Sequence, residues 1–207
     1  VELVFAPVAP AGLRLGWGGV FALLWGLRVA FAWRISRDEP ATLDALRARL
    51  RLWIAGTLLT AALWGWAAWS FYPFGGALQQ IALILVVYTF CVACVPILAP
   101  QLALYLAFVG LVYLPAIARV ALHDGGGQGV QTAAVMFVAM AMTMVLGRDY
   151  RHAFDHLSRL QLHSDALLER LRAEKAAADA ARQQAEVANR AKTQFFAAAS
   201  HDLRQPL

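Results

Sequence analysis

Residues 77–98 read ALQQIALILVVYTFCVACVPIL, a stretch without one charged side chain. It lies within a longer segment, Leu52 to Ala118, that contains no Asp, Glu, Lys or Arg. A helix that spans a bilayer needs roughly 20 consecutive apolar residues, whereas a soluble domain would interrupt such a segment with charged turns. The whole chain is 60% hydrophobic, against roughly 45–50% for an ordinary soluble domain. The sequence therefore predicts a membrane protein.

Five apolar segments are long enough to cross a membrane. Turns rich in Gly and Pro separate the last four of them, because these residues end helices. The predicted fold class is all-α, with a multi-span transmembrane helix bundle over residues 16–147 that has five spans, at approximately 16–35, 52–71, 77–98, 101–122 and 130–146.

The arginines predict the orientation of the bundle. Five of them crowd into the polar segment 34–51, which we expect to be a loop, and Arg148 and Arg151 directly follow the fifth span. Cytoplasmic loops carry an excess of Lys and Arg, so these segments are predicted to be cytoplasmic. Five crossings then place residue 1 outside, and we expect residues 1–15 to be the outer end of an upstream span. No basic stripe carries interleaved aromatic residues, which argues against nucleic-acid binding and favours membrane lipids as partners.

Several side chains within the spans have two interpretations each. Arg28 can snorkel to the inner surface or take part in sensing. Cys91 and Cys94 can pack as apolar residues or form a redox or metal site, but that helix has no further ligand. Three tyrosines in the third and fourth spans could line a cavity, and Pro115 is expected to kink the fourth span. These tyrosines are Tyr88, Tyr105 and Tyr113.

Two further groups have compositions that suit metal binding. His152 and His156 lie one helical turn apart, where solvation at the membrane edge is the simpler interpretation. The methionines of the fifth span can provide soft packing or a path for copper. We favour packing, and no metal site is predicted. These methionines are Met136, Met140, Met142 and Met144.

The segment 148–194 is polar, alanine-rich and free of Pro and Gly after Gly147. Apolar residues recur in it with seven-residue spacing, which predicts a parallel coiled coil between two copies of the chain. Ser164 and Glu174 interrupt this seam. Its two rows are Leu157, Leu171, Ala178 and Ala185, and Leu160, Leu167, Ala181 and Ala188.

The last residues, 195–207, read FFAAASHDLRQPL. Phe196, Ala199 and Leu203 share one helical face, and His201 points about 140° away from it. An exposed imidazole beside the carboxylate of Asp202 is a plausible nucleophile, because a carboxylate can orient the ring. A solvated His-Asp pair is the simpler interpretation of these two residues by themselves. Pro206 predicts a bend just after them.

The string SHDLRQPL resembles the phosphoacceptor box of sensor histidine kinases, and residues 186–196, EVANRAKTQFF, are similar to the lead-in to that box in hybrid kinases. The resemblance covers residues 186–207. It implies a bacterial, multi-pass inner-membrane sensor whose residues 148–194 form a cytoplasmic coiled-coil signalling helix. Residues 195–207 would begin the dimerisation and phosphotransfer domain.

The resemblance also implies a mechanism. His201 would attack the γ-phosphate of ATP held with Mg²⁺ by a downstream domain, and Asp202 would act as base or orienting group. The phosphoryl group would then pass to an aspartate of a response-regulator receiver domain, possibly in the same chain. Gln205 stands where the family often has Thr or Asn at a position used for phosphatase activity, which puts that activity in doubt.

We therefore expect the input and relay portion of a homodimeric histidine kinase in a two-component system. Without an ATP-binding domain the chain would be inactive by itself. Two alternatives remain: a transporter-like protein with an oligomerising C-terminal helix, and a membrane receptor with another output, such as a cyclase. The spans hold no carboxylate for ion coupling, which argues against a transporter.

Overall fold

The computed structural model describes residues 2–37, 42–123 and 127–202, and within these residues it is helical with no strand. It divides into two compact units, Val1–Phe154, here the bundle unit, and Asp155–Leu207, here the linker unit. The elements are α1 (Glu2–Phe5), α2 (Ala11–Arg37), α3 (Leu43–Phe71), the 3-10 helix η1 (Tyr72–Phe74), α4 (Ala77–Ala93), α5 (Val95–Leu98), α6 (Leu102–His123) and α7 (Gly127–Asp202).

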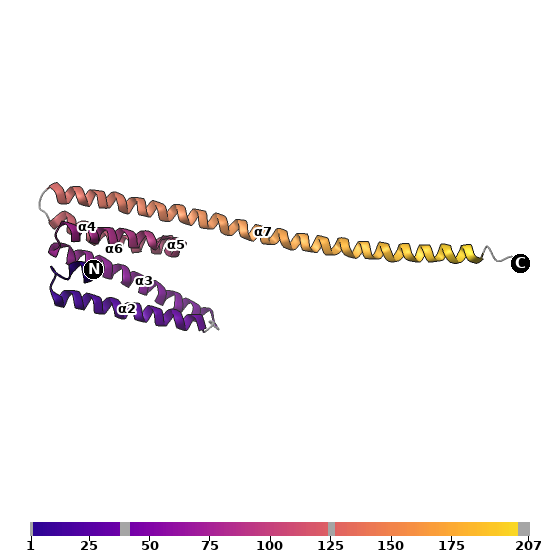
Figure 1. Cartoon of the computed structure of the whole chain (residues 1–207), viewed down its shortest axis with the longest axis horizontal. Coiled ribbons are helices and arrows are strands. Elements are labelled where there is room, and N and C mark those ends of the chain that lie inside the picture. The colour runs from indigo at the N-terminus through magenta and orange to yellow at the C-terminus, as the bar shows by residue number, and fades with distance from the viewer. Residues whose placement is uncertain (1, 38–41, 124–126, 203–207) are drawn as a thin grey trace. The chain divides into compact units, whose positions relative to one another are not determined.

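Five helical stretches are long and apolar enough to cross a membrane, which confirms the all-α, multi-pass fold class. In the bundle unit, α2, α3, α4, α6 and the first part of α7 run up and down beside one another (Figure 1). The third predicted span consists of α4 and the short helix α5. Pro96 stands in the first turn of α5, where a missing N–H is tolerated.

The polar segment 34–51, which we expected to be a loop, is mostly helical. Helix α2 continues to Arg37, and α3 already begins at Leu43. The Thr42 side chain accepts a hydrogen bond from the backbone N–H of Ala45 at 3.3 Å, which caps α3 and satisfies one of its free donors. The arginines of this segment therefore extend two transmembrane helices. We call this end of the bundle the arginine end.

The centre of the bundle is the pair α3–α6. Gly65 of α3 lies so close to the backbone carbonyl of Leu111 in α6 that a Cβ would not fit. Pro115 stands inside α6, as predicted, and the helix continues through it. Because proline has no N–H, the Leu111 carbonyl loses its usual partner in the helix. The glycine allows α3 to cover that carbonyl.

Residues 2–10 fold against the end of the bundle opposite the arginine end. Phe5 is 1% exposed, and its ring centroid lies 5.5 Å from that of Phe71. Helix α2 then begins at Ala11, earlier than the predicted span. The upstream span that we expected before these residues stays a prediction.

Trp17 joins α2 to α3 at the same end of the bundle. Its side chain is 4% exposed, and its indole N–H donates to the carbonyl of Leu63 at 3.2 Å. The Trp64 ring meets it edge-on at 5.5 Å. Aromatic contacts of this kind add to the stability from area burial, so α2 is fixed to the bundle here.

Candidate functional site

The candidate catalytic residues, His201 and Asp202, lie at the C-terminal end of α7, and the N-terminal part of that helix packs against the bundle. Within residues 127–154, here the bundle segment of α7, one face is buried against the other helices. Its buried side chains recur at intervals of three and four residues, which is the spacing of one helical face. The buried residues are Gly129, Ala133, Met136, Met140, Thr143 and Gly147.

The closest contact on this face joins α6 to the arginine end of the bundle segment. Tyr105 of α6 is 0% exposed, and its ring lies directly on Gly147, where a Cβ would overlap it. The Tyr105 hydroxyl donates to the backbone carbonyl of Thr143 at 3.0 Å. Gly147 therefore allows a large side chain to fit against the helix just before the chain becomes polar.

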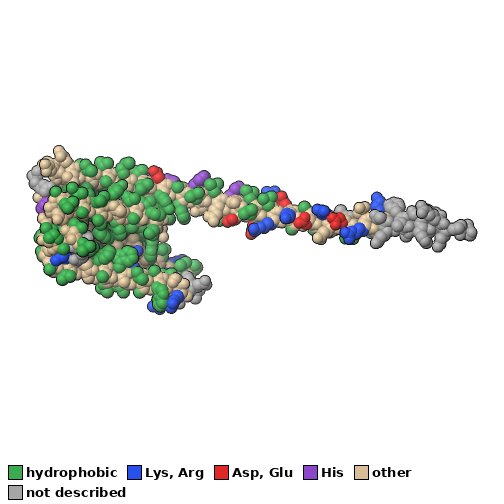
Figure 2. Space-filling model, viewed as in Figure 1, with side chains coloured by type: hydrophobic (Ala, Val, Ile, Leu, Met, Phe, Trp, Pro, Cys, Tyr) green, Lys and Arg blue, Asp and Glu red, His purple; other side chains and the backbone are tan. Residues whose placement is uncertain are grey.

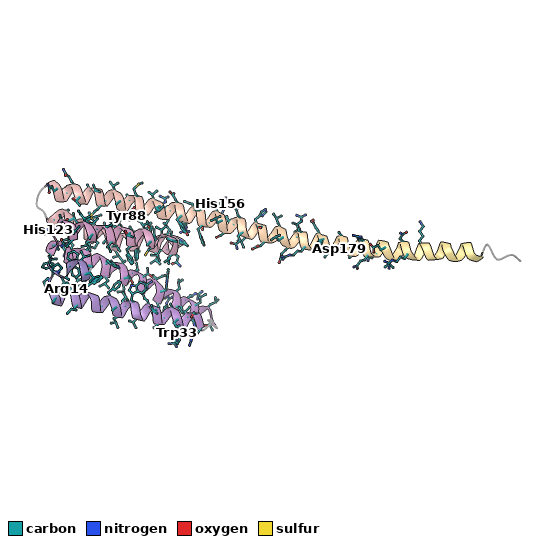
Figure 3. All side chains as sticks on the ribbon, viewed as in Figure 1. Arg14, Trp33, Tyr88, His123, His156 and Asp179 are labelled. Atoms are coloured by element: carbon teal, nitrogen blue, oxygen red, sulfur yellow. The ribbon has the colours of Figure 1, made fainter. Side chains whose placement is uncertain are left out.

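Residues 155–202, here the linker segment of α7, differ sharply. All its described side chains are exposed except that of Ser158, which is half-buried. Figure 2 shows acidic and basic side chains mixed along this segment, in contrast to the apolar surface of the bundle. Figure 3 shows side chains projecting from the helix around Asp179. The leucines of the predicted seam are all exposed. Their exposed fractions are 65% for Leu157, 52% for Leu160, 46% for Leu167 and 60% for Leu171.

Glu174, which interrupts the predicted seam, forms an ion pair with a residue of its own helix. Arg170 Nε donates to Glu174 Oε1 at 3.1 Å, one helical turn apart. Arg182 and Glu186 form a second pair of the same spacing at 3.0 Å. These exposed pairs support the helix weakly. The coiled coil itself stays a prediction.

Helix α7 continues to Asp202, so the backbones of His201 and Asp202 are both helical. The side chains of these two residues, and with them the predicted exposed position of the imidazole, lie outside the described part of the structure. Gln205 and the bend expected at Pro206 also lie outside the described residues. The roles of His201, Asp202 and Gln205 stay predictions.

The tyrosines of the spans divide into two groups. Tyr88 and Tyr113 line an apolar cavity of about 240 Å³ between α4, α6 and α7. Tyr105 does not line it and packs on Gly147 instead. Met136 lines the same cavity and is 3% exposed, whereas Met142 is 65% exposed.

The other candidate ligands lie in different surroundings. Cys91 is completely buried in the apolar core, and Cys94 is half-buried. His152 and His156 are both exposed on α7, and Figure 3 labels His156. Within the described residues, no three His, Cys, Asp or Glu side chains form a group that could hold a metal ion.

Arg28 has partners inside the bundle. Its Nη1 donates to the Gly56 carbonyl at 3.1 Å and to Thr60 Oγ1 at 2.8 Å, both on α3. We expected snorkelling to the inner surface as the simpler interpretation. These contacts hold the guanidinium across to α3 instead, because Gly56 has no side chain to block it. In the sequence Arg28 is an isolated arginine, and its pairing depends on how α2 and α3 are aligned.

Comparisons with protein-family models, curated proteins and solved structures produced no match.

Proposed function

We propose that this chain is the input and relay part of a bacterial sensor histidine kinase. The observation that carries the proposal is the unbroken course of α7, which begins as a membrane-competent helix at Gly127 and reaches Asp202. Such a helix would link the membrane-competent segment to the His-Asp pair. A relay of this kind requires a signal that binds one arrangement of the helices better than another.

The phosphoryl transfer that we propose uses one nitrogen of His201. That nitrogen would attack the γ-phosphorus of ATP held with Mg²⁺ by a separate domain. A P–N bond would form, the bond to the bridging oxygen would break, and ADP would leave. Asp202 would orient the imidazole or accept its proton. A receiver aspartate would then take the phosphoryl group. Such transfers depend mainly on positioning and charge stabilisation.

The decisive experiment uses the protein as its organism produces it. The purified protein is incubated with ATP labelled at the γ-phosphate. We expect a label that is lost in acid and stable in base, and we expect it to disappear in His201→Gln. His163→Gln is the matched control, because His163 is an exposed histidine of the same helix. Labelled protein in the His201→Gln variant would contradict the proposal and favour a receptor with another output.

We further propose that the arginine end faces the cytoplasm of a bacterial inner membrane. The excess of arginines at one end of two helices supports this orientation. Single cysteines in place of Asp44, at the arginine end, and Gln128, at the opposite end, test it in a background without Cys91 and Cys94. A membrane-impermeant thiol reagent added to intact spheroplasts should label only Gln128→Cys. Labelling of Asp44→Cys alone would reverse the topology.

A further inference from the structure

A groove of about 780 Å³ opens between α2 and α3 towards the arginine end. Trp17 fixes α2 to α3 at the opposite end, and the residues that line the groove lie between this contact and the arginine end. The walls of the groove are almost entirely apolar and include the rings of Trp25 and Trp53. Arg28 is the charged residue that lines it.

The charge of Arg28 is not balanced by the protein's spans. The guanidinium is half-buried, and the two oxygens that accept from its Nη1 belong to the neutral residues Gly56 and Thr60. The sequence has no Asp or Glu between Glu2 and Asp38, and none between Asp44 and Asp124. A cation within a membrane is costly without a counter-charge, so an anion from outside the chain would be stabilised here.

The dimensions and walls of the groove restrict which anion fits. The volume lies within the range of roughly 300–1,000 Å³ that is usual for small-molecule sites. The apolar walls suit a hydrocarbon chain, and a guanidinium binds a carboxylate through two parallel hydrogen bonds. Arg28 lies about 9 Å along α2 from Arg34 at the arginine end. A bound anion must therefore leave the level of the headgroups, which a small carboxylate does more easily than a phosphodiester that carries glycerol and two chains.

We propose that the groove between α2 and α3 binds a single-chain amphiphile with a carboxylate head. The carboxylate pairs with Arg28, and the hydrocarbon chain lies between the two helices. This proposal does not depend on the histidine kinase function, because the groove lies entirely within the bundle unit.

The test uses the chain in phosphatidylcholine nanodiscs, with a dibrominated long-chain fatty acid as the probe. Bromine quenches indole fluorescence at short range, so binding beside Trp25 and Trp53 should give saturable quenching. Arg28→Gln should weaken the affinity about tenfold or more, because a charged hydrogen-bonding partner is lost. Arg34→Gln, which removes an equal charge outside the groove, should leave the affinity within about twofold, well below that tenfold change.

A second variant distinguishes loss of binding from a folding defect, and two further probes identify the source of the ligand. Ala32→Phe fills the groove and keeps the arginine, so it should also weaken binding. The methyl ester of the probe, which has no charge, should not give saturable quenching. Wild-type affinity in both Arg28→Gln and Ala32→Phe would overturn the proposal. Equal Arg28-dependent quenching by a dibrominated phosphatidylglycerol would overturn the single-chain assignment in favour of bulk anionic lipid.

Discussion

The two segments of α7 have the same backbone conformation and opposite environments. In the bundle segment, a face that includes Met140 and Gly147 is buried against the other helices. In the linker segment, the apolar stripe that includes Leu160 and Leu167 and is interrupted at Ser164 and Glu174 is exposed. The bundle segment therefore uses its apolar face within its own chain, whereas the linker segment keeps an apolar face that a second copy could cover.

The bundle segment also has exposed apolar side chains. Val135, Val138 and Met142 lie away from its buried face, and they are 69%, 60% and 65% exposed. In a membrane, exposed apolar residues need no protein partner, because lipid tails solvate them. The leucines of the linker segment are exposed to water, which solvates apolar side chains unfavourably. We therefore expect dimerisation to depend mainly on the linker segment.

The largest expected effect is on dimerisation, and it should differ between substitutions on the two sides of the linker segment. Leu160→Asp puts a charge into the seam of both copies, and losing a buried leucine costs roughly 2–5 kcal/mol in each. The dimer should weaken by at least about three orders of magnitude, measured by analytical ultracentrifugation in detergent. Leu162→Asp is the matched control, because Leu162 is even more exposed, at 71%, and lies on the opposite side of the helix. Equal dimerisation of the two variants would rule out the proposed seam.

The next effect concerns the bundle segment. Gly147→Ala places a methyl group where the Tyr105 ring lies, and overpacking of this kind costs about 1–3 kcal/mol. The free energy of unfolding, measured by titration with SDS, should fall accordingly. Gly26→Ala is the control, since a Cβ at Gly26 meets nothing within 4 Å. If both alanines were tolerated equally, the contact between α6 and α7 would not be as close as described.

A smaller effect is expected for the hydrogen bond at the same contact. Tyr105→Phe removes the donor to the Thr143 carbonyl and keeps the ring. The loss should be about 0.5–1.5 kcal/mol of unfolding free energy. Tyr88→Phe serves as the comparison, because Tyr88 is 43% exposed and should change little. A larger loss in Tyr88→Phe than in Tyr105→Phe would contradict the importance that we give to the α6–α7 contact.

The smallest effect belongs to the ion pairs of the linker segment. The side chains of Arg170 and Glu174 are 78% and 61% exposed, so solvent screens the pair. Arg170→Ala should lower the stability of the linker helix by only about 0.3–0.5 kcal/mol, measured by thermal denaturation. This difference should vanish at about 1 M salt, where the screening length is about 3 Å. A difference that persists at high salt would show that the arginine acts through packing.

The sequence predicted the features of the fold that depend on composition over many residues. The spans follow from apolar length, and the regular course of the linker segment follows from the absence of Pro and Gly after Gly147. The helical character of 34–51 was missed, because its charges resemble those of a loop and its cap depends on Thr42 alone.

Contacts between helices could not be predicted, because they depend on how the helices are aligned. The sequence indicated neither the pairing of Arg28 with Thr60 nor the packing of Tyr105 on Gly147. A glycine within an otherwise continuous helix was the available signal for the second contact. For the candidate site, the structure adds the helical backbone at His201 and Asp202.

The contact between Gly65 and the Leu111 carbonyl has a consequence for movement within the membrane. Hydrocarbon offers no hydrogen-bond donor, so a carbonyl that has lost its partner to proline must stay covered. Sliding α3 past α6 would uncover that carbonyl and drive the next side chain of α3 against it. We therefore expect these two helices to move least within the bundle, and any rearrangement to involve the helices around them, α2, α4 and α7.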